Sequence, residues 1–334
     1  MKFRYFKHLI FTATSWALGA NDDVLVGGQA VIEGVMMRSP KGYSVAIRRR
    51  DGSYRVVKEL LQTTGEKWKI FKLPIVRGVG VLGQALVLGI KALRWSADEA
   101  MLDEEPSDKT TADPARSLGA AAKAESTPAG APAALPSWVI AGSMVMALGV
   151  NIAMFIALPL FMTGLLQKQL GFESHLLFNA IDGVFRVGTF VTFLLTISFM
   201  KDMRRVFAYH GAEHKTVYNF EAREPLSVEN ADKYSTLHPR CGTSFLLVLM
   251  VVSIIVFSLF HFDTIAGKLA SRIVLLPLIA GISYEVIRYS AKHPDSLMRL
   301  VTYPGLLLQK ITTKKPDESQ LATAIKALEE ALSV

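Results

Sequence analysis

The sequence predicts an α+β membrane protein: a four-helix transmembrane bundle with a cytoplasmic, β-containing N-terminal region and a cytoplasmic helical loop and tail. Three observations support this prediction. The chain of 334 residues is 51% hydrophobic and 20% charged, so it is more apolar than an average soluble protein. Its second half contains long apolar runs, which are separated by loops of unequal positive charge. Its N-terminal part instead alternates apolar and polar residues, as strands do.

Four segments of the second half are long and apolar enough to cross a hydrocarbon core of ~30 Å. They are residues 138–165, 176–200, 243–262 and 273–291. The second and fourth segments each contain an oppositely charged pair on one helical face: Asp182 with Arg186, and Glu285 with Arg288. We interpret Asp182 and Arg186 as a structural ion pair. Glu285 lies near the cytoplasmic end of its segment, where it is either a functional residue or the partner of Arg288.

Lys and Arg are unevenly distributed among the loops. The loop 201–242 contains seven of them, whereas the short connections 166–175 and 263–272 contain few. Cytoplasmic loops carry the excess of positive charge, so this loop and both termini are predicted to be cytoplasmic. Residues 1–21 resemble a secretory signal peptide, but cleavage there would export the basic region that follows. We therefore predict an interfacial helix for residues 1–21. The basic charge suits anionic lipid rather than nucleic acid.

Residues 22–97 are predicted to form the cytoplasmic β region. Asp51-Gly52 separates two alternating stretches, which indicates a β-hairpin. Residues 74–95 predict an apolar helix that lies in the membrane interface or packs on the bundle. Residues 98–137 are rich in Ala, Pro, Ser and acidic side chains, so they are predicted to be a disordered linker.

The cytoplasmic tail, residues 292–334, is predicted to contain an amphipathic helix. Its apolar residues recur at helical spacing, and they are Leu321, Ile325, Leu328 and Leu332. We expect this helix to pack against the protein's own cytoplasmic region.

The strongest candidate for chemistry is "YHGAEHK" in the loop 201–242. If this stretch is helical, His210 and His214 stand one turn apart on one face, which suits two bonds to one metal ion. The string also fits the H-x-x-E-H pattern of inverted zinc peptidases, in which the Glu, here Glu213, is a general base. The distal Glu ligand of such enzymes has no clear counterpart, because Glu221 is only seven residues on.

A second stretch, "HPRCGTS", offers two more donors to the same ion. His238 and Cys241 are spaced H-x-x-C, and imidazole and thiolate are both good zinc ligands. Cys241 is the one cysteine of the chain, so an internal disulfide is excluded. Four protein ligands would indicate a structural zinc, whereas three would leave a catalytic position open. Two metal-free alternatives remain: the side chains cap helix ends, or they form a catalytic or anion-binding site.

The apolar stretch "VGGQAVIEGVMMRSP" contains one carboxylate, Glu33. A carboxylate in such a poorly solvated setting needs a compensating cation or metal. We expect Glu33 either to serve as a partner of the His cluster or to pair with Arg38 or one of Arg48–Arg50.

Several of these stretches resemble one family. "GGQAVIEGVMMRSP", "YHGAEHKTVYNFE", "HPRCGTSF", "AGISYEVIR" and "PGLLLQKITTKKPDESQ" are similar, in this order, to the YqhQ-like bacterial membrane proteins, the family of unknown function numbered 1385. The resemblance covers the chain except its first twenty residues and residues 98–137. It implies a multi-pass protein of the bacterial inner membrane and a metal-dependent enzyme. The stretch "TTKKPDES" is less acidic than this resemblance leads us to expect, which weakens any metal role for the tail.

Two functions are compatible with these observations. The first is a metal-dependent enzyme, a zinc hydrolase at the cytoplasmic membrane surface, whose substrate is lipid-linked or a membrane protein. The candidate Zn²⁺ ligands are His210, His214, His238 and Cys241, and the candidate catalytic residues are Glu213, Glu33 and Glu285. The second is a non-catalytic membrane scaffold or assembly factor, with a structural zinc or no metal.

Overall fold

The computed structural model describes residues 26–61, 70, 73–104, 137–239, 241–260, 262, 264–292 and 298–334. The predicted interfacial helix 1–21 and most of the predicted linker 98–137 lie outside the described residues. The first residues of that linker are helical, because helix α3 (Val76–Glu104) continues through them. Two acidic side chains hold this end of α3 on the β-region: Glu99 accepts from Arg49 at 2.8 Å, and Asp103 accepts from the N–H of Arg50 at 2.7 Å.

Four antiparallel strands form one sheet in the order β1-β2-β3-β4. They are β1 (Gly27–Val31), β2 (Gly34–Arg38), β3 (Gly42–Arg48) and β4 (Tyr54–Leu60). The hairpin at Asp51-Gly52 is confirmed, and Gly52 has a φ of +86°, which glycine adopts without strain. The two residues Ile32 and Glu33 form the tight turn between β1 and β2. Glu33 therefore lies in a turn and not within a strand.

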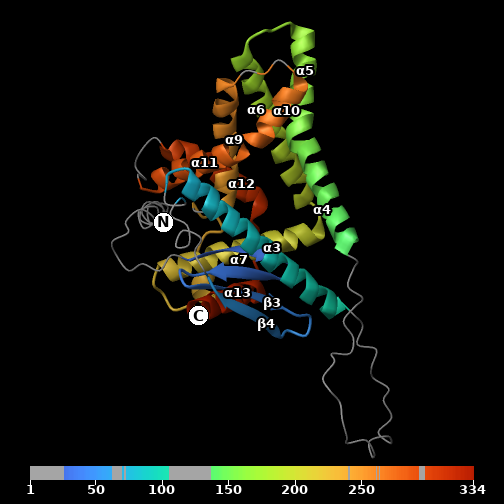
Figure 1. Ribbon diagram of the computed structural model, residues 1–334. Helices are drawn as coiled ribbons and strands as arrows, with labels where there is room; N and C mark the ends of the chain where they lie inside the picture. The colour runs from blue at the N-terminus through green and yellow to red at the C-terminus, as the bar shows by residue number, and fades with distance from the viewer. Residues whose placement is uncertain are drawn as a thin grey trace, which may run out of the picture.

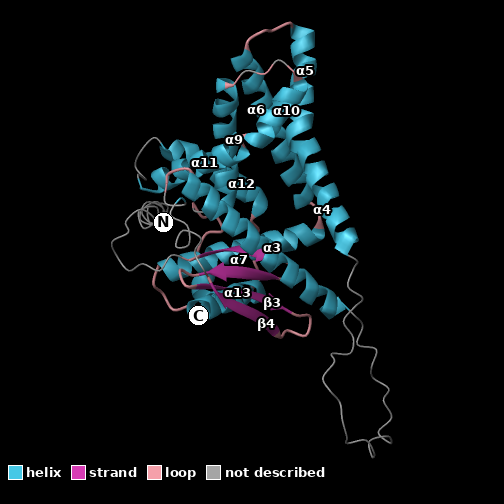
Figure 2. Cartoon of the chain, in the orientation of Figure 1, coloured by secondary structure: helices cyan, strands magenta, loops and turns pink. Residues whose placement is uncertain are grey.

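Helices cover both faces of the sheet, as Figures 1 and 2 show. The helices are α3 on one face and, on the other, α7 (Lys201–Glu221) with α13 (Glu318–Leu332). Successive side chains of β2 point to opposite faces. Met36 belongs to a buried cluster with Leu88 of α3, whereas Met37 belongs to a cluster with Leu328 of α13. The sheet is thus the middle of three layers.

The remaining long helices form a bundle on the other side of α7 from α13 (Figure 1). They are α4 (Ser137–Ile152), a π-helical turn (Ala153–Ala157), α5 (Leu158–Leu170), α6 (His175–Ser198), α9 (Gly242–Leu259), α10 (Ile265–Val274), α11 (Leu276–Lys292) and α12 (Met298–Thr312). A short helix, α8 (Val228–Asp232), lies in the connection between α7 and α9. The segment 201–242, predicted as a helical loop, is largely helical.

Within the described residues, four helices are long and apolar enough to cross a membrane. They are Val76–Asp103, Val145–Leu170, His175–Ser198 and Gly242–Leu259. The last three correspond to the first three predicted spans. The predicted fourth span, residues 273–291, does not form one straight helix, because α10 and α11 meet at 47°. Pro277 explains the break, since proline has no N–H to continue the helical ladder.

Helix α3 joins the bundle to the sheet. Its first turn packs against α11. A side chain at Gly78 would clash with Tyr284 of α11, so only glycine fits at this position. Further along, the carbonyl of Gly89 accepts a hydrogen bond from Gln29 at 3.2 Å, and Ser96 accepts one from the N–H of Ile32 at 3.3 Å. The predicted helix 74–95 therefore packs on the bundle at one end and on the sheet along the rest.

The predicted amphipathic tail helix is confirmed as α13, and it packs on the protein's own sheet. Leu321 and Leu328 are fully buried against strands β2 and β3, whereas Leu332 is 37% exposed. A capping box starts the helix: Asp317 accepts from the N–H of Gln320, and the Gln320 side chain accepts from the N–H of Asp317. Helix α13 is thus part of the core that it forms with the sheet and α7.

Candidate metal centre

Helix α7 lies between the sheet and the bundle and carries the H-x-x-E-H string (Figure 1). Gly211 allows the chain after α12 to pass directly over α7. A Cβ at this position would stand 2.1 Å from the carbonyl oxygen of Lys314. The N–H of Lys314 in turn donates to the carbonyl of Phe207 at 2.9 Å. This contact brings the end of α12 to His210.

Both histidines of the string have their Nδ1 atom fixed by a backbone carbonyl. The Nδ1 of His210 donates to the carbonyl of Thr312 at 2.8 Å, and the Nδ1 of His214 donates to that of Thr236 at 2.5 Å. With the Nδ1–H engaged, the Nε2 atom of each ring carries the free lone pair. Metal-binding histidines are usually oriented by such a second hydrogen bond.

The two Nε2 atoms and the Cys241 sulfur point to one region. The Nε2 of His210 lies 3.2 Å from the Cys241 Sγ. His214 is only 2% exposed, and its Nε2 has no hydrogen-bond partner. The ligand atoms of His210, His214 and Cys241 all lie within 4.8 Å of one another. Among the described residues, these three side chains form the group that is close enough together to hold one metal ion. Zinc bonds of about 2.0–2.3 Å are within reach of this set after small side-chain rotations.

Cys241 occupies the N-cap position of α9, the helix that follows it directly. Its sulfur accepts a hydrogen bond from the N–H of Thr243 at 3.5 Å. The sulfur therefore lies at the positive end of the helix dipole, where a thiolate ligand is favoured.

His238 lies beside this group but does not belong to it. Its ring centre is 5.6 Å from that of His214, and its Nε2 is 3.7 Å from a carboxylate oxygen of Glu221. The side chain of Gln309 fixes the backbone here, because it accepts from the N–H of His238 at 2.7 Å and donates to its carbonyl at 2.8 Å. Of the four predicted ligands, three converge and the fourth forms a buried neighbour.

Glu213 projects from α7 towards strand β1 and is 6% exposed. It accepts a hydrogen bond from the backbone of Gly28. A Cβ on Gly28 would approach the Glu213 side chain to 3.2 Å, so the glycine makes room for the carboxylate. Burial raises the pKa of Glu213, while the charges of His210 and His238 act in the opposite direction. Glu213 thus lies within electrostatic reach of the centre.

The other two predicted catalytic carboxylates form ion pairs. Glu33 accepts from the Nε of Arg205 on α7 at 2.5 Å, in place of the expected Arg38 or Arg48–Arg50. Glu285 accepts a hydrogen bond from the Nε of Arg77 on α3 at 2.6 Å. Arg77, and not the expected Arg288, is therefore its main partner. In the described residues, neither carboxylate belongs to the group of three converging ligands.

Sequence reasoning did not find Gln309 or the two carbonyl groups that orient the imidazoles. Gln309 is fully buried on α12. A glutamine within the apolar run "PGLLLQKIT" is the one signal that pointed to it.

Comparison with known proteins identifies the family of this chain. The family described as "Protein of unknown function (DUF1385)" matches residues 73–334. The chain belongs to this family. The "Uncharacterized protein YqhQ" of Bacillus subtilis (strain 168) is 33% identical to it over 307 residues, which is 92% of each chain. No solved structure is significantly similar to this DUF1385 chain.

We expect the chelator-treated protein to lose stability as the pH falls from about 6.5 towards 4. Burial lowers the pKa of His238 to about 4 and also lowers that of His214. Both groups titrate near ~6.5 in the unfolded chain, so in this window the unfolded state binds more protons and acid favours unfolding. Thermal unfolding midpoints across this range measure the effect.

The variant His238→Gln should flatten this pH dependence. The same change at exposed His175 should leave it as in the wild type. Equal slopes for His238→Gln and the wild type would show that His238 is not the titrating group.

Proposed function

We propose that this chain is a zinc-dependent hydrolase that acts at the cytoplasmic surface of the bacterial inner membrane. The observation that carries the proposal is the convergence of His210, His214 and Cys241 within 4.8 Å. Three protein ligands with a fourth position open are typical of catalytic zinc sites, whereas structural sites use four. The separate position of His238 therefore supports a catalytic rather than a structural site.

Zinc held by three such ligands acts as a Lewis acid and makes water nucleophilic near neutral pH. The side chains of this chain supply the rest of the site. Glu213 lies between the two histidines in the chain, at the position of the general base in the H-x-x-E-H pattern. We assign proton transfer to its carboxylate. Gln309, through the backbone of His238, holds the turn that leads to Cys241.

The surroundings of the centre support a substrate attached to the membrane. Helix α9, which begins next to Cys241, is long and apolar enough to cross a bilayer. The sheet lies on the other side of α7 (Figure 1). The centre is thus at the level where the apolar bundle ends. A lipid-linked compound or a segment of a membrane protein would present its polar bond at this level.

We assign structural roles to Glu33 and Glu285 in this function. The ion pair of Glu33 with Arg205 connects the β1–β2 turn to α7. The ion pair of Glu285 with Arg77 connects α11 to α3. Both pairs hold the elements around the centre together.

The variant Glu213→Gln should bind zinc as the wild type does and lose function. Loss of a general base typically lowers the rate about 10²–10⁴-fold, and the amide is nearly isosteric with the carboxyl group. Two quantities are measured. The first is the zinc content per chain, and the second is the ability of the variant gene to restore the growth of a strain from which the gene for this protein has been deleted.

The matched control is Glu229→Gln, an exposed position on α8, which should rescue fully. Full rescue by a zinc-loaded Glu213→Gln protein would contradict the hydrolase and favour a scaffold with a structural zinc.

A further inference from the structure

A second group of buried charges lies in the bundle, away from the candidate metal centre. Asp182 and Arg186 belong to the first half of α6, and Arg272 belongs to the last turn of α10. The end of α6 leads into α7, so these residues lie at the end of the bundle farther from the sheet (Figure 1). Asp182 and Arg272 are each only 2% exposed.

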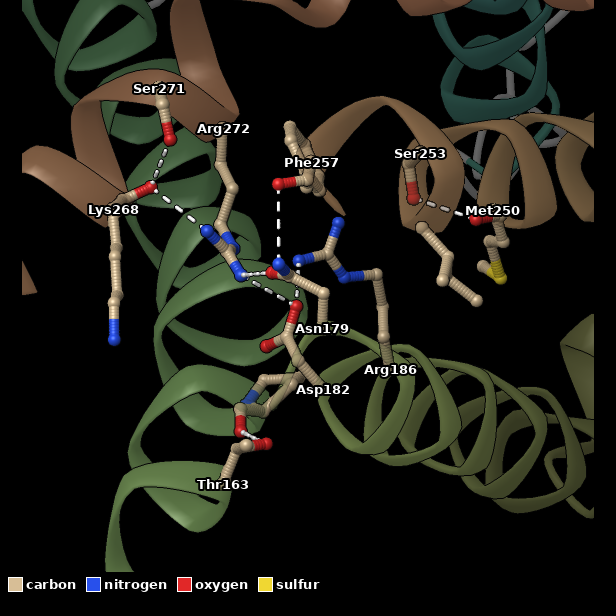
Figure 3. A network of polar contacts seen from close by, with 12 residues as sticks. Thr163, Asn179, Asp182, Arg186, Met250, Ser253, Phe257, Lys268, Ser271 and Arg272 are labelled. Carbon is tan, nitrogen blue, oxygen red and sulfur yellow. Dashed lines mark hydrogen bonds and ion pairs between the residues drawn. The ribbon is translucent and has the colours of Figure 1, made fainter. Parts of the chain in front are cut away.

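The polar contacts of this group are unevenly shared, as Figure 3 shows. Arg186 and Arg272 both donate to the same oxygen, Oδ2 of Asp182, at 2.9 Å each. The other oxygen, Oδ1 of Asp182, is buried without a hydrogen-bond partner. The Nε–H groups of Arg186 and Arg272 are also buried without an acceptor. One acceptor and two donors are thus left unsatisfied in a small volume.

The group also carries an excess of positive charge. Arginine stays protonated in proteins, so two guanidinium groups face one carboxylate. Within the described part of the chain, the ion pairs of both arginines go to Asp182. The guanidinium groups lie 4.8 and 5.3 Å from the ring centre of Phe257, which stabilises them only in part. An uncompensated charge among apolar helices is costly and marks a functional site.

A ligand that satisfies all of these groups must carry one negative charge, accept two hydrogen bonds and donate one. A phosphate group with a neighbouring hydroxyl has this combination, and arginine is well suited to bind phosphate. We propose that Asp182, Arg186 and Arg272 bind a singly charged phosphate group that carries a hydroxyl donor. The phosphate oxygens accept from the two Nε–H groups, and the hydroxyl donates to Oδ1 of Asp182.

The neighbouring side chains fit this assignment. Asn179 is held by the carbonyl of Phe257 at 3.2 Å and accepts from Arg272 at 3.4 Å, so it keeps Arg272 in place. The side chain of Arg186 is 11% exposed, against 3% for Arg272, which makes Arg186 the side from which a ligand enters. The site is therefore reached most readily beside Arg186.

Two sources supply this chemistry: the glycerophosphate headgroup of a lipid and free dihydrogen phosphate. The test is thermal unfolding of the full chain in phosphatidylcholine nanodiscs. Phosphatidylglycerol is titrated into the discs in one arm, and inorganic phosphate is added to the buffer in the other. We expect a saturable rise of the unfolding midpoint with phosphatidylglycerol. A rise with inorganic phosphate alone would assign the site to the free ion, and no rise in either arm would overturn the proposal.

Variants separate ligand binding from packing. Arg272→Gln and Arg186→Gln should each require about tenfold more of the ligand for the same rise, since each removes a charge-assisted hydrogen bond. Arg204→Gln removes the same charge from an exposed position on α7 and should behave as the wild type. If Arg186→Gln lowers the midpoint equally at every lipid composition and leaves the ligand response unchanged, the group is only a packing contact and the proposal fails.

Discussion

Replacing His210 and His214 together by alanine is expected to abolish zinc binding. The wild-type chain, purified from membranes, should hold about one zinc ion, because two imidazoles and one thiolate converge within 4.8 Å. After both nitrogen ligands are lost, Cys241 alone cannot hold the ion, and a neighbouring carboxylate does not replace the two imidazoles. Zinc at about 100 times its dissociation constant stabilises the folded state by ~2.7 kcal/mol, and the double variant should lack this increment.

Elemental analysis of the purified protein, with and without added zinc, measures the first effect. Thermal unfolding in the presence and absence of a chelator measures the second. The variant His175→Ala changes an exposed histidine at the start of α6 and should bind zinc normally. A double variant that retains the zinc content of the wild type would refute the site.

Replacing Gly211 by valine is expected to cause the largest loss of stability among single substitutions at the centre. Even a Cβ at this position would lie 2.1 Å from the carbonyl oxygen of Lys314, a backbone atom that cannot rotate away. The side chain must therefore separate α7 from the segment after α12. Overpacking of this kind costs about 1–3 kcal/mol or more. The same displacement removes the Thr312 carbonyl from His210, so zinc binding should weaken as well.

Chemical or thermal unfolding, combined with a zinc titration, measures both consequences of Gly211→Val. Gly83 on α3 provides the matched control, because a Cβ added there would meet no atom within 4 Å. Gly83→Ala should be neutral or slightly stabilising, since alanine favours a helix by ~1 kcal/mol over glycine. A Gly211→Val protein with wild-type stability would mean that the contact with Lys314 does not exist in solution.

Local patterns in the sequence predicted much of the fold. The alternation around Asp51-Gly52 gave the β3–β4 hairpin, and the spacing from Leu321 to Leu328 gave the tail helix. Each of these patterns depends on residues that are close in the chain. The strands that α13 covers, β2 and β3, could not be predicted, because an amphipathic helix does not specify which apolar surface it packs on.

The candidate site divides in the same way. The arrangement of His210 and His214 could be predicted from the sequence, because residues at i and i+4 share one face of a helix. The partners that orient or neutralise the site are distant in the chain. Glu33 and its partner Arg205 are 172 residues apart, and His210 and Thr312 are 102 apart. For Glu33, one of the two alternatives was a pair with a nearby arginine, and the arginine that it pairs with is the distant Arg205, because the turn position of Glu33 directs it to α7.

The junction of sheet and tail has a consequence for how the protein is made. The Ser44 hydroxyl on β3 donates to the carbonyl of Ala327 on α13, across 283 residues of chain. At a synthesis rate of ~5–20 residues per second, roughly 15 to 60 s separate the emergence of these two residues from the ribosome. During this interval the apolar face of β2 and β3 has no α13 to cover it, while the apolar helices of the bundle are being synthesised. The carbonyl of Thr312 also arrives late, so the centre around His210 is among the last parts of the molecule to assemble.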